Sequence, residues 1–509
     1  MTTRNLERTR DIYEENAAYP VAPQIPLLEL TSENVFQSLH IRKDRISSAL
    51  LWGLGTLSGF SRFYKKRLPQ QLDNLLKTQD LRRAGLQAPV ISATLAFVDD
   101  ERIQDPVART VTLILGAKSL YDDIKSGSLE PDMLKDQVLE MGQYPNLFST
   151  TLTVKNKKSQ LFKSARTDQI TVLVRGQIYL FYIDEWNNDI FNKLYATLSR
   201  LITQSTDNQN SQVEIGLATS ASQVLQVRGF TRMQQVEKNK ENLEKLRHSF
   251  LALCLDIDDF PADQNEAFFK AHAQNLHNRW SWQSLQLVVF GNAKAGAICN
   301  FSAYLDGNTM MRGAAEIQQR ANCLNIPQFV ETEIKLDYEA LDWKIYPLFR
   351  ERVRSNVEQV LDSQRATFEI TNFNRKRLEE LDLDPVGVFV TALALAMDTF
   401  VASPAVIHQF LTMSRYRFMD LTTAVVSTSH VQVFCEFIKT GAVENQRALE
   451  LLKLAVKSQT NACRIERSAL SLVTAFTLYL KSRPLLKNIW PVILYLIIQS
   501  ILRKQRYLT

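Results

Sequence analysis

The stretch Ser284–Phe290 reads Ser-Leu-Gln-Leu-Val-Val-Phe, and a second apolar run, Ala295–Phe301, follows it after Gly291-Asn292. Two β-rich runs joined by a turn of this kind predict a β-hairpin. Asn278-Arg279-Trp280 stands directly before the first run. The apolar character of Leu285–Phe290 also predicts that this strand contributes to the core.

The residues on either side of this hairpin alternate between helical and strand patterns. Gln169–Val174 and Gln177–Ile183, joined by Arg175-Gly176, predict a second hairpin. A further short strand is expected at Val213–Thr219. Apolar spacing predicts helices over Asp105–Lys125 with Gly127 as C-cap, Trp186–Gln204, Asn239–Cys254, Asp384–Val401 and Glu444–Ser468. The helix at Asp384–Val401 is apolar enough to be buried on most sides.

Interleaved helices and strands with these hairpins predict an α/β fold with mixed sheets flanked by helices. The chain has 509 residues, which exceeds an ordinary single core and predicts two domains or lobes. Its net charge of +6 is small for this length. We therefore expect no nucleic-acid partner.

The five cysteines are scattered and form no Cys-x-x-Cys pair. This pattern argues against a disulfide framework and against a zinc site, and it predicts a reducing intracellular compartment. The N-terminal residues mix Arg with several acids and contain no apolar core, so they do not resemble a secretory or transit peptide.

Several segments, taken in order, resemble the carnitine/choline O-acyltransferase family. The proline-rich opening at Tyr19–Pro26 is similar to that family, and so is the helix at Asp105–Leu129, which ends in a Gly-small-Leu step. The same holds for the Gln-Tyr-x-x-Leu-Phe-Ser run at Gln143–Ser149 and the Val-x-Arg-Gly-Gln-x-Tyr hairpin at Val174–Tyr179. The last two similar segments are the Asn-Arg-Trp block at Asn278–Phe290 and the Leu-x-Trp step at Leu341–Trp343. Each segment alone is weakly specific; their common order over residues 19–470 is specific.

The resemblance implies a CoA-dependent acyltransferase fold. It is an α/β fold of two similar lobes, each a mixed sheet flanked by helices, with a tunnel between them. On this basis we expect residues 1–88 and 345–509 to form a discontinuous first lobe, and residues 89–344 to form the second. The family moves an acyl group between a CoA thioester and the hydroxyl of carnitine or choline.

The resemblance also implies a catalytic histidine, which takes the proton of the attacking hydroxyl. Counting forward from Gly296 puts Phe301 in its place, and counting back from Asp306-Gly307 puts Ser302 there. Phe cannot accept a proton, and a lone Ser is not a base. His277 and His430 are the candidates for a replacement base, although a surface or core role is the simpler interpretation of each. We predict no catalytic residue and no metal site.

The family's CoA-binding lysines correspond to the region of Arg375. Arg375 keeps a positive charge and is a weak candidate for a CoA contact, whereas Glu379 stands at a second lysine position and would repel phosphate. The family's Arg-Ile-Pro-Gly step corresponds to 151–154, and its Gly-Arg-Thr-Glu step corresponds to 421–424, where all charge is lost. Ser427-Thr428-Ser429 lies too early to be the family's Ser-Thr-Ser step. We predict weak or absent CoA binding and no other cofactor.

These replacements favour a non-catalytic homologue with a binding or structural role and a protein partner. The alternatives are an active acyltransferase with a rearranged site, and a sensor that binds acyl-CoA without turnover. The enzyme needs a base that faces the tunnel; the sensor needs phosphate-binding charges.

The segment Ile489–Leu502 is uncharged and mostly apolar, with Lys487 before it and Arg503 after it. A buried helix is one interpretation. The other is a short membrane-contacting tail, which would place the protein at a mitochondrial or other organelle membrane. As a helix the segment extends only about 21 Å, less than the roughly 30 Å of a hydrocarbon core.

Overall fold

The structure is a computed structural model, and its described parts fall in two compact units. It describes residues 92–155, 158–205, 214–300, 305–325, 336–361, 374–401, 406–412, 414, 421–441 and 444–468. The first unit holds residues 92–132 and 141–361 of this set, and the second holds 133–140 and 374–468. The predicted lobe boundaries near residues 88 and 345 stay predictions.

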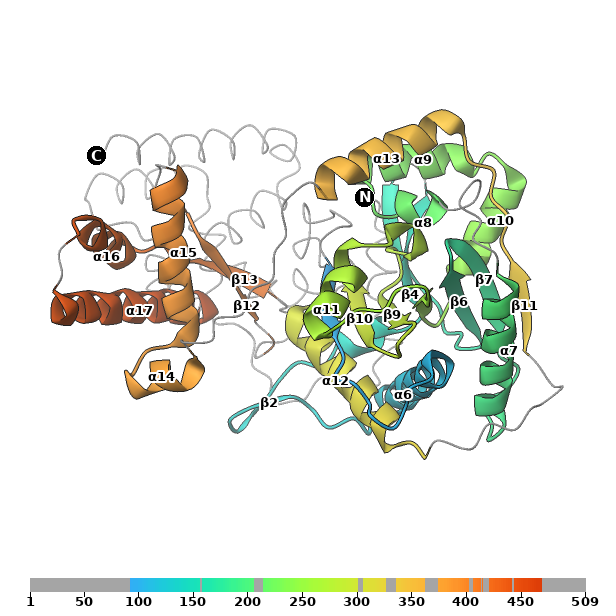
Figure 1. Ribbon diagram of the computed structural model, residues 1–509, viewed down its shortest axis with the longest axis horizontal. Coiled ribbons are helices and arrows are strands. Elements are labelled where there is room, and N and C mark those ends of the chain that lie inside the picture. Colours follow the sequence, from blue (N-terminus) through green and yellow to red (C-terminus); the bar gives the residue numbers. More distant parts are fainter. Residues whose placement is uncertain are drawn as a thin grey trace, which may run out of the picture. The chain divides into compact units, whose positions relative to one another are not determined.

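A seven-stranded mixed sheet forms the centre of the first unit (Figure 1). The parallel pairs are β6–β8 and β8–β9, and the other neighbours are antiparallel. In spatial order the strands are β1 Ser92–Ala96, β10 Ala295–Asn300, β9 Leu285–Phe290, β8 Ala252–Asp256, β6 Gln169–Val174, β7 Gln177–Tyr182 and β11 Asp337–Ala340. Every residue of β6, β8, β9 and β10 is buried, as expected for strands that are covered on both faces.

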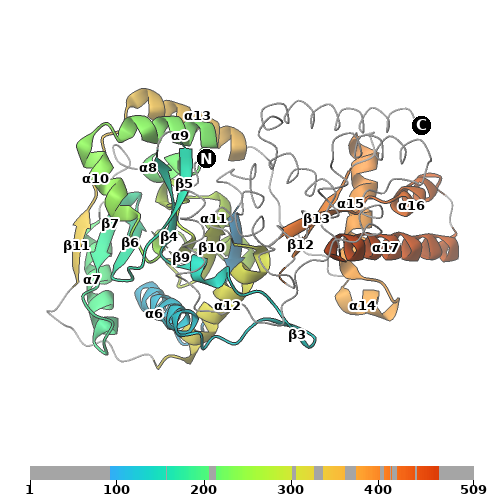
Figure 2. The same cartoon turned by 180° about the vertical axis from the view of Figure 1, so that it is seen from behind.

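Helices cover each face of this sheet, and alternate residues of a strand face opposite cores. Leu287 and Val289 of β9 join a core with helices α6 Pro106–Ser126, α7 Ile190–Gln204 and α12 Gly307–Cys323. Val288 and Phe290 join the other core. That core contains helices α8 Glu214–Ala218, α9 Gln223–Met233, α10 Glu237–Leu246, α11 Gln264–Ala273 and α13 Pro347–Leu361. Helices α9 and α13 lie side by side, and the view from behind in Figure 2 agrees.

Both predicted hairpins are confirmed. β6 and β7 pair through Arg175 and Gly176, which have φ values of 48° and 73° and so allow the tight turn. β9 and β10 pair around Gly291-Asn292. The predicted C-cap is also confirmed, since Gly127 ends α6 with φ 76°. The mixed α/β fold class is therefore confirmed.

Two sequence predictions in this unit are wrong. The predicted strand Val213–Thr219 is the short helix α8, because Ile215 and Ala218 fall on one helical face and bury in the core. The predicted helix Asn239–Cys254 ends at Leu246, and β8 begins at Ala252. The apolar run from Phe250 to Leu255 continues the hydrophobic pattern, which hides the change from helix to strand.

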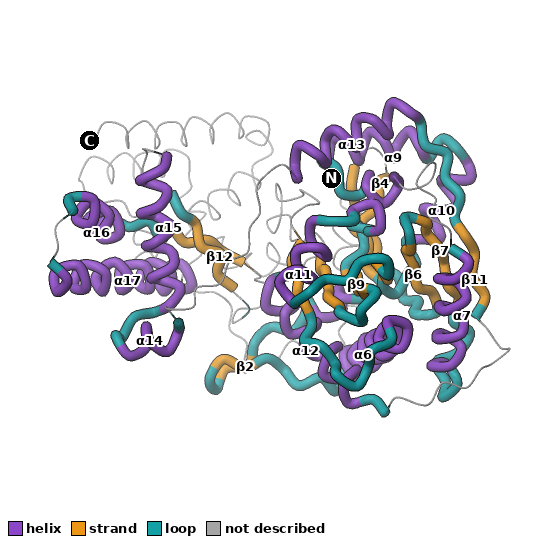
Figure 3. Tube along the Cα trace, viewed as in Figure 1, coloured by secondary structure: helices purple, strands orange, loops and turns teal. Residues whose placement is uncertain are grey.

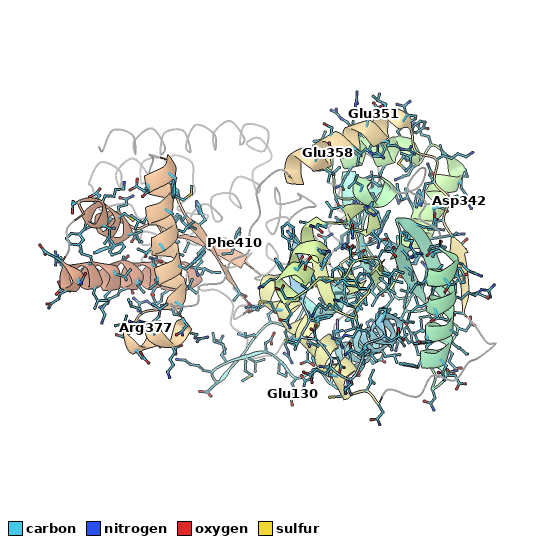
Figure 4. All side chains as sticks on the ribbon, viewed as in Figure 1. Glu130, Asp342, Glu351, Glu358, Arg377 and Phe410 are labelled. Atoms are coloured by element: carbon cyan, nitrogen blue, oxygen red, sulfur yellow. The ribbon has the colours of Figure 1, made fainter. Side chains whose placement is uncertain are left out.

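The second unit combines helices with small two-stranded sheets, and Figure 3 separates the two kinds of element by colour. Its elements are β2 Met133–Leu134, β3 Gln137–Val138, α14 Arg375–Glu380, α15 Pro385–Val401, β12 His408–Thr412, β13 Leu421–Val425, α16 Ser429–Lys439 and α17 Asn445–Ser468. The helices predicted at Asp384–Val401 and Glu444–Ser468 are confirmed as α15 and α17. The expected burial of α15 on most sides is wrong, because between Pro385 and Phe400 only Gly387, Val390, Thr391 and Ala394 are buried.

The residues that the structure describes include no helix long and apolar enough to cross a membrane. The predicted contact segment Ile489–Leu502 lies outside these residues, as does the proline-rich opening.

Candidate functional site

The candidate site lies where β10 ends and α12 begins. Asn300 closes β10: its backbone N–H donates to the Ser284 carbonyl at 2.9 Å, and its side-chain Nδ2 donates to the Ser281 carbonyl at 2.8 Å. Phe301 and Ser302, the residues at the predicted base position, lie just beyond it and outside the described residues. The described chain resumes at Leu305, which is buried.

Asp306 begins helix α12. Its backbone is extended (φ −101°), and Oδ1 accepts a hydrogen bond from the Thr309 N–H at 2.9 Å. This is the geometry of an N-cap, and a carboxylate there also complements the helix dipole. Asp306 is almost fully buried, so its second carboxylate oxygen also needs a donor.

Gln143 supplies that donor. It is the residue before the short 3₁₀ helix η2 Tyr144–Leu147, and its Nε2 donates to Asp306 Oδ2 at 3.4 Å. Its Oε1 accepts from the Asp306 N–H at 2.6 Å and from Thr309 Oγ1 at 3.3 Å. Hydrogen bonds therefore link the Gln143–Ser149 run to the start of α12. The Gln143 side chain holds both the backbone N–H and the carboxylate of Asp306.

Tyr144 fastens the same run to a different part of α12. Its hydroxyl donates to Asp132 Oδ2 at 2.6 Å, and Arg312 Nη1 donates to Asp132 Oδ1 at 2.7 Å. Burial, together with the neighbouring Asp132 carboxylate, raises the pKa of Tyr144 well above its usual range. The phenol therefore stays protonated as a donor, and this cluster anchors the run.

A lysine contacts the same run from the neighbouring hairpin. The hairpin consists of β4 Thr150–Lys155 and β5 Lys158–Lys163. Lys163 Nζ donates to Asn146 Oδ1 at 3.3 Å, and Asn146 is fully buried in η2. Burial lowers the pKa of Lys163 from 10.5 to about 7. A large fraction of this amine is therefore uncharged at neutral pH, and an uncharged amine can accept a proton.

Hydrogen bonds place Lys163 in one row with the end of β10. Thr150 is the register partner of Lys163, the Ser284 N–H donates to the Thr150 carbonyl, and the Asn300 N–H donates to the Ser284 carbonyl. Adjacent strands are spaced by about 4.8 Å, so three steps put the backbones of Lys163 and Asn300 roughly 14 Å apart. The candidate site thus combines the Asp306 carboxylate at the start of α12, the buried side-chain amides of Gln143 and Asn146, and the Lys163 amine.

The Gln143–Ser149 run forms part of this site, and the Asn278–Phe290 block forms part of the central sheet. Both are segments that resemble the family named in the sequence analysis. The family described as Choline/Carnitine o-acyltransferase matches residues 82–471. The chain belongs to this family.

Individual relatives are distant. The chain is similar to mitochondrial carnitine O-acetyltransferase of Saccharomyces cerevisiae (23% identity, over 45% of this chain and 35% of the relative). It is similar to choline O-acetyltransferase of Mus musculus (22% identity, 74% and 63%) and to mitochondrial carnitine O-palmitoyltransferase 2 of Mus musculus (28% identity, 35% and 27%). The matched part thus spans less than two thirds of each of these relatives.

The candidate replacement bases lie in other surroundings. His277 belongs to the 3₁₀ helix η3 Leu276–Asn278, whose backbone touches α8 at Gly216. His430 is exposed at the start of α16, in the second unit. Two histidines that the sequence did not single out contact hydroxyls: His248 Nδ1 lies 3.2 Å from Ser164 Oγ, and His272 Nδ1 lies 2.8 Å from Thr94 Oγ1.

Arg375, the predicted CoA contact, is the first residue of α14. Its Nε donates to Glu379 Oε1 at 2.7 Å along an exposed helix face. The residue that stands at a family lysine position therefore forms an ion pair with Arg375. The CoA role of Arg375 stays a prediction.

The other positions compared with family motifs are parts of regular structure. Residues 151–154 lie in β4, and 421–424 lie in β13, where Ala424 is fully buried against the core. Ser427 Oγ accepts from the Ile407 N–H, and Thr428 caps α16. These hydroxyls therefore take part in local hydrogen bonds that hold the second unit together.

Sequence reasoning missed Lys163. Ser159, Leu161 and Lys163 alternate along β5, and Leu161 packs against the core. A lysine that continues the apolar face of a strand is the pattern that could have identified it.

Proposed function

We propose that this chain is a non-catalytic member of the family, with a binding or structural role and a protein partner. The observation that carries the proposal is the absence of a base at both positions compared with the family histidine, Phe301 and Ser302. Removing a general base costs about 10²–10⁴ in rate. The pairing of Arg375 with Glu379 supports the same interpretation, because a carboxylate now stands at a family lysine position and pairs with the neighbouring arginine.

A direct assay tests this function. Purified full-length protein would be mixed with acetyl-, octanoyl- or palmitoyl-CoA and with carnitine or choline, and acyl esters would be measured by mass spectrometry. The expected result is no product above the rate without protein, with the yeast carnitine O-acetyltransferase as positive control. Ester formation at the control's rate would refute the proposal. Micromolar CoA affinity in calorimetry, without turnover, would favour an acyl-CoA sensor instead.

Lys163 favours a second candidate, an active acyltransferase with a rearranged site. An uncharged Lys163 amine would take the proton of the acceptor hydroxyl while its oxygen forms a bond to the thioester carbonyl carbon. The carbon–sulfur bond then breaks, and the proton passes to the departing CoA thiolate. The acyl group leaves as an ester, and no oxidant or reductant is needed.

Two lysine variants of the same hairpin separate the candidates. If the protein is active through Lys163, Lys163→Met abolishes product, whereas Lys155→Met, which changes an exposed lysine on β4, leaves the rate unchanged. The rate would also rise with pH around 7, because the proton acceptor is the uncharged amine. A rate that is insensitive to Lys163→Met would remove this candidate.

A further inference from the structure

Helix α15 carries a row of large apolar side chains on one exposed face, which we call the α15 stripe. Its members are Val386, Phe389, Leu393, Met397 and Phe400. Spacings of three and four residues place them on the same side of the helix. Phe389 is 66% exposed and Phe400 is 86% exposed. Isolated exposed apolar residues are ordinary, whereas a continuous row of this size marks a surface that something covers.

The neighbouring side of α15 is already packed within the second unit. Val390 joins a core with β12, β13 and α17, and Ala394 joins another with α16 and α17. Gln459 of α17 donates to Thr391 Oγ1 at 2.7 Å and to the Gly387 carbonyl at 3.2 Å. The helix is therefore fixed in place, and its stripe is a rigid surface.

We propose that residues 489–502 of the same chain cover the α15 stripe. Fourteen residues as a helix extend about 21 Å, and the 14 steps from Val386 to Phe400 span the same length of α15. The segment is uncharged over this length, and the stripe contains no charged side chain. Such an uncharged and mostly apolar segment gains stability when its apolar side chains are buried against another apolar surface.

The chain can return from α17 to the stripe. Val456 and Gln459 both contact α15 around Gly387, and α17 ends at Ser468, nine residues and about 14 Å further on. Residues 469–488 can span up to about 66 Å when extended. A covering segment on the protein itself also agrees better with the length than a membrane span, because about 21 Å is too short for a hydrocarbon core of about 30 Å.

Photo-crosslinking of the full-length protein tests this contact. Benzoylphenylalanine would replace Phe389 or Phe400, and crosslinked peptides would be identified by mass spectrometry. The expected result is a crosslink to residues 489–502 within one chain, which a mixture of isotope-labelled and unlabelled protein distinguishes from a crosslink between chains. Phe260 is the matched control, since it is 63% exposed in the first unit and should give no such product.

A second measurement does not depend on the probe. Phe389→Asp should expose the tail and accelerate tryptic cleavage at Lys487 and Arg503 by about tenfold, and Ile497→Asp should do the same from the other side. Phe260→Asp should leave the cleavage rate unchanged. A crosslink to the apolar residues 46–60, a crosslink between chains, crosslinking to phosphatidylcholine vesicles, or no crosslink at all would each overturn the proposal.

Discussion

In the first unit, a fully buried arginine lies beside a carboxylate, whereas a partly buried lysine lies beside a neutral amide. At the start of the central hairpin, Arg279 donates to both Asp256 oxygens, at 3.0 and 2.6 Å, and both side chains are about 1% exposed. At the candidate site, Lys163 contacts the neutral amide of Asn146, and no carboxylate among the described residues pairs with it. The paired charges of Arg279 and Asp256 are therefore expected to stabilise the folded state, whereas burial of the Lys163 amine is expected to lower the free energy of unfolding.

The largest effect is expected at the paired charges. Replacing Arg279 by Met leaves Asp256 buried without its partner, and Asn278 alone cannot compensate for the lost charge. Breaking a buried pair in this way costs roughly 3–5 kcal/mol. Urea unfolding followed by tryptophan fluorescence would measure the loss, since Trp280 and Trp282 lie beside the pair in sequence.

The exposed pair Arg166–Asp168 provides the control. Its geometry is similar, with Arg166 Nε 2.9 Å from Asp168 Oδ1, but both side chains are about half exposed. Asp168→Ala should therefore change the free energy of unfolding by less than about 1 kcal/mol. Equal effects of Arg279→Met and Asp168→Ala would show that the buried pair does not support the sheet.

Replacing Lys163 is expected to raise the free energy of unfolding, whereas replacing Arg279 lowers it. The folded chain holds the pKa of Lys163 at about 7, whereas an unfolded lysine has its ordinary value of 10.5. Between these values the unfolded chain binds more protons, so the free energy of unfolding rises as pH rises from about 7 toward 10. Lys163→Met should remove this rise and stabilise the protein at pH 7 by about 2 kcal/mol.

Thermal or urea unfolding at pH 7 and pH 9.5 checks the prediction. The Met variant should be more stable than the native protein at pH 7, and the difference between the two should be clearly smaller at pH 9.5. Lys155→Met, on the exposed part of the hairpin, should show neither effect. A destabilised Met variant at pH 7 would mean that Lys163 is charged and paired.

A smaller loss is expected at Gln143. Its side chain makes hydrogen bonds to the Asp306 backbone and carboxylate and to Thr309 Oγ1. Gln143→Leu would remove these hydrogen bonds from buried polar groups, which costs about 1–3 kcal/mol. Asp306→Asn is the informative companion because it keeps an oxygen for the N-cap bond, and it should cost less. Hydrogen exchange of the first turn of α12 would localise the loss; unchanged exchange there would contradict it.

Sequence patterns predicted the strongly periodic parts of this fold well. The two hairpins and the helices α6, α7, α15 and α17 follow from apolar spacing and turn residues alone. The errors fell where the pattern is short or continuous: five residues of α8 cannot establish a helical period, and Phe250–Leu255 extends the apolar character of the helix before it.

The candidate site was less predictable than the fold. Gln143 and Asp306 are 163 positions apart in sequence, and only the packing of η2 against α12 brings them together. The state of Lys163 depends on burial by residues remote in sequence, which no local pattern records. The exposure of the α15 stripe was missed for a similar reason, since an apolar helix has the same composition whether all its faces are covered or only some.

The smallest effect is expected at Arg375. The side chain is fully exposed and pairs with Glu379 one helical turn away, and such pairs are screened by water and salt. Arg375→Ala should leave the unfolding midpoint unchanged within error. It should also leave CoA binding unchanged in calorimetry, because the neighbouring carboxylate already offsets the positive charge. Glu379→Lys is the sharper variant, since it restores a lysine and frees Arg375 together. If CoA affinity rises in Glu379→Lys and falls again in the double variant with Arg375→Ala, the position is a CoA site that Glu379 has closed. If neither variant changes the affinity, α14 is an exposed helix without a phosphate-binding role.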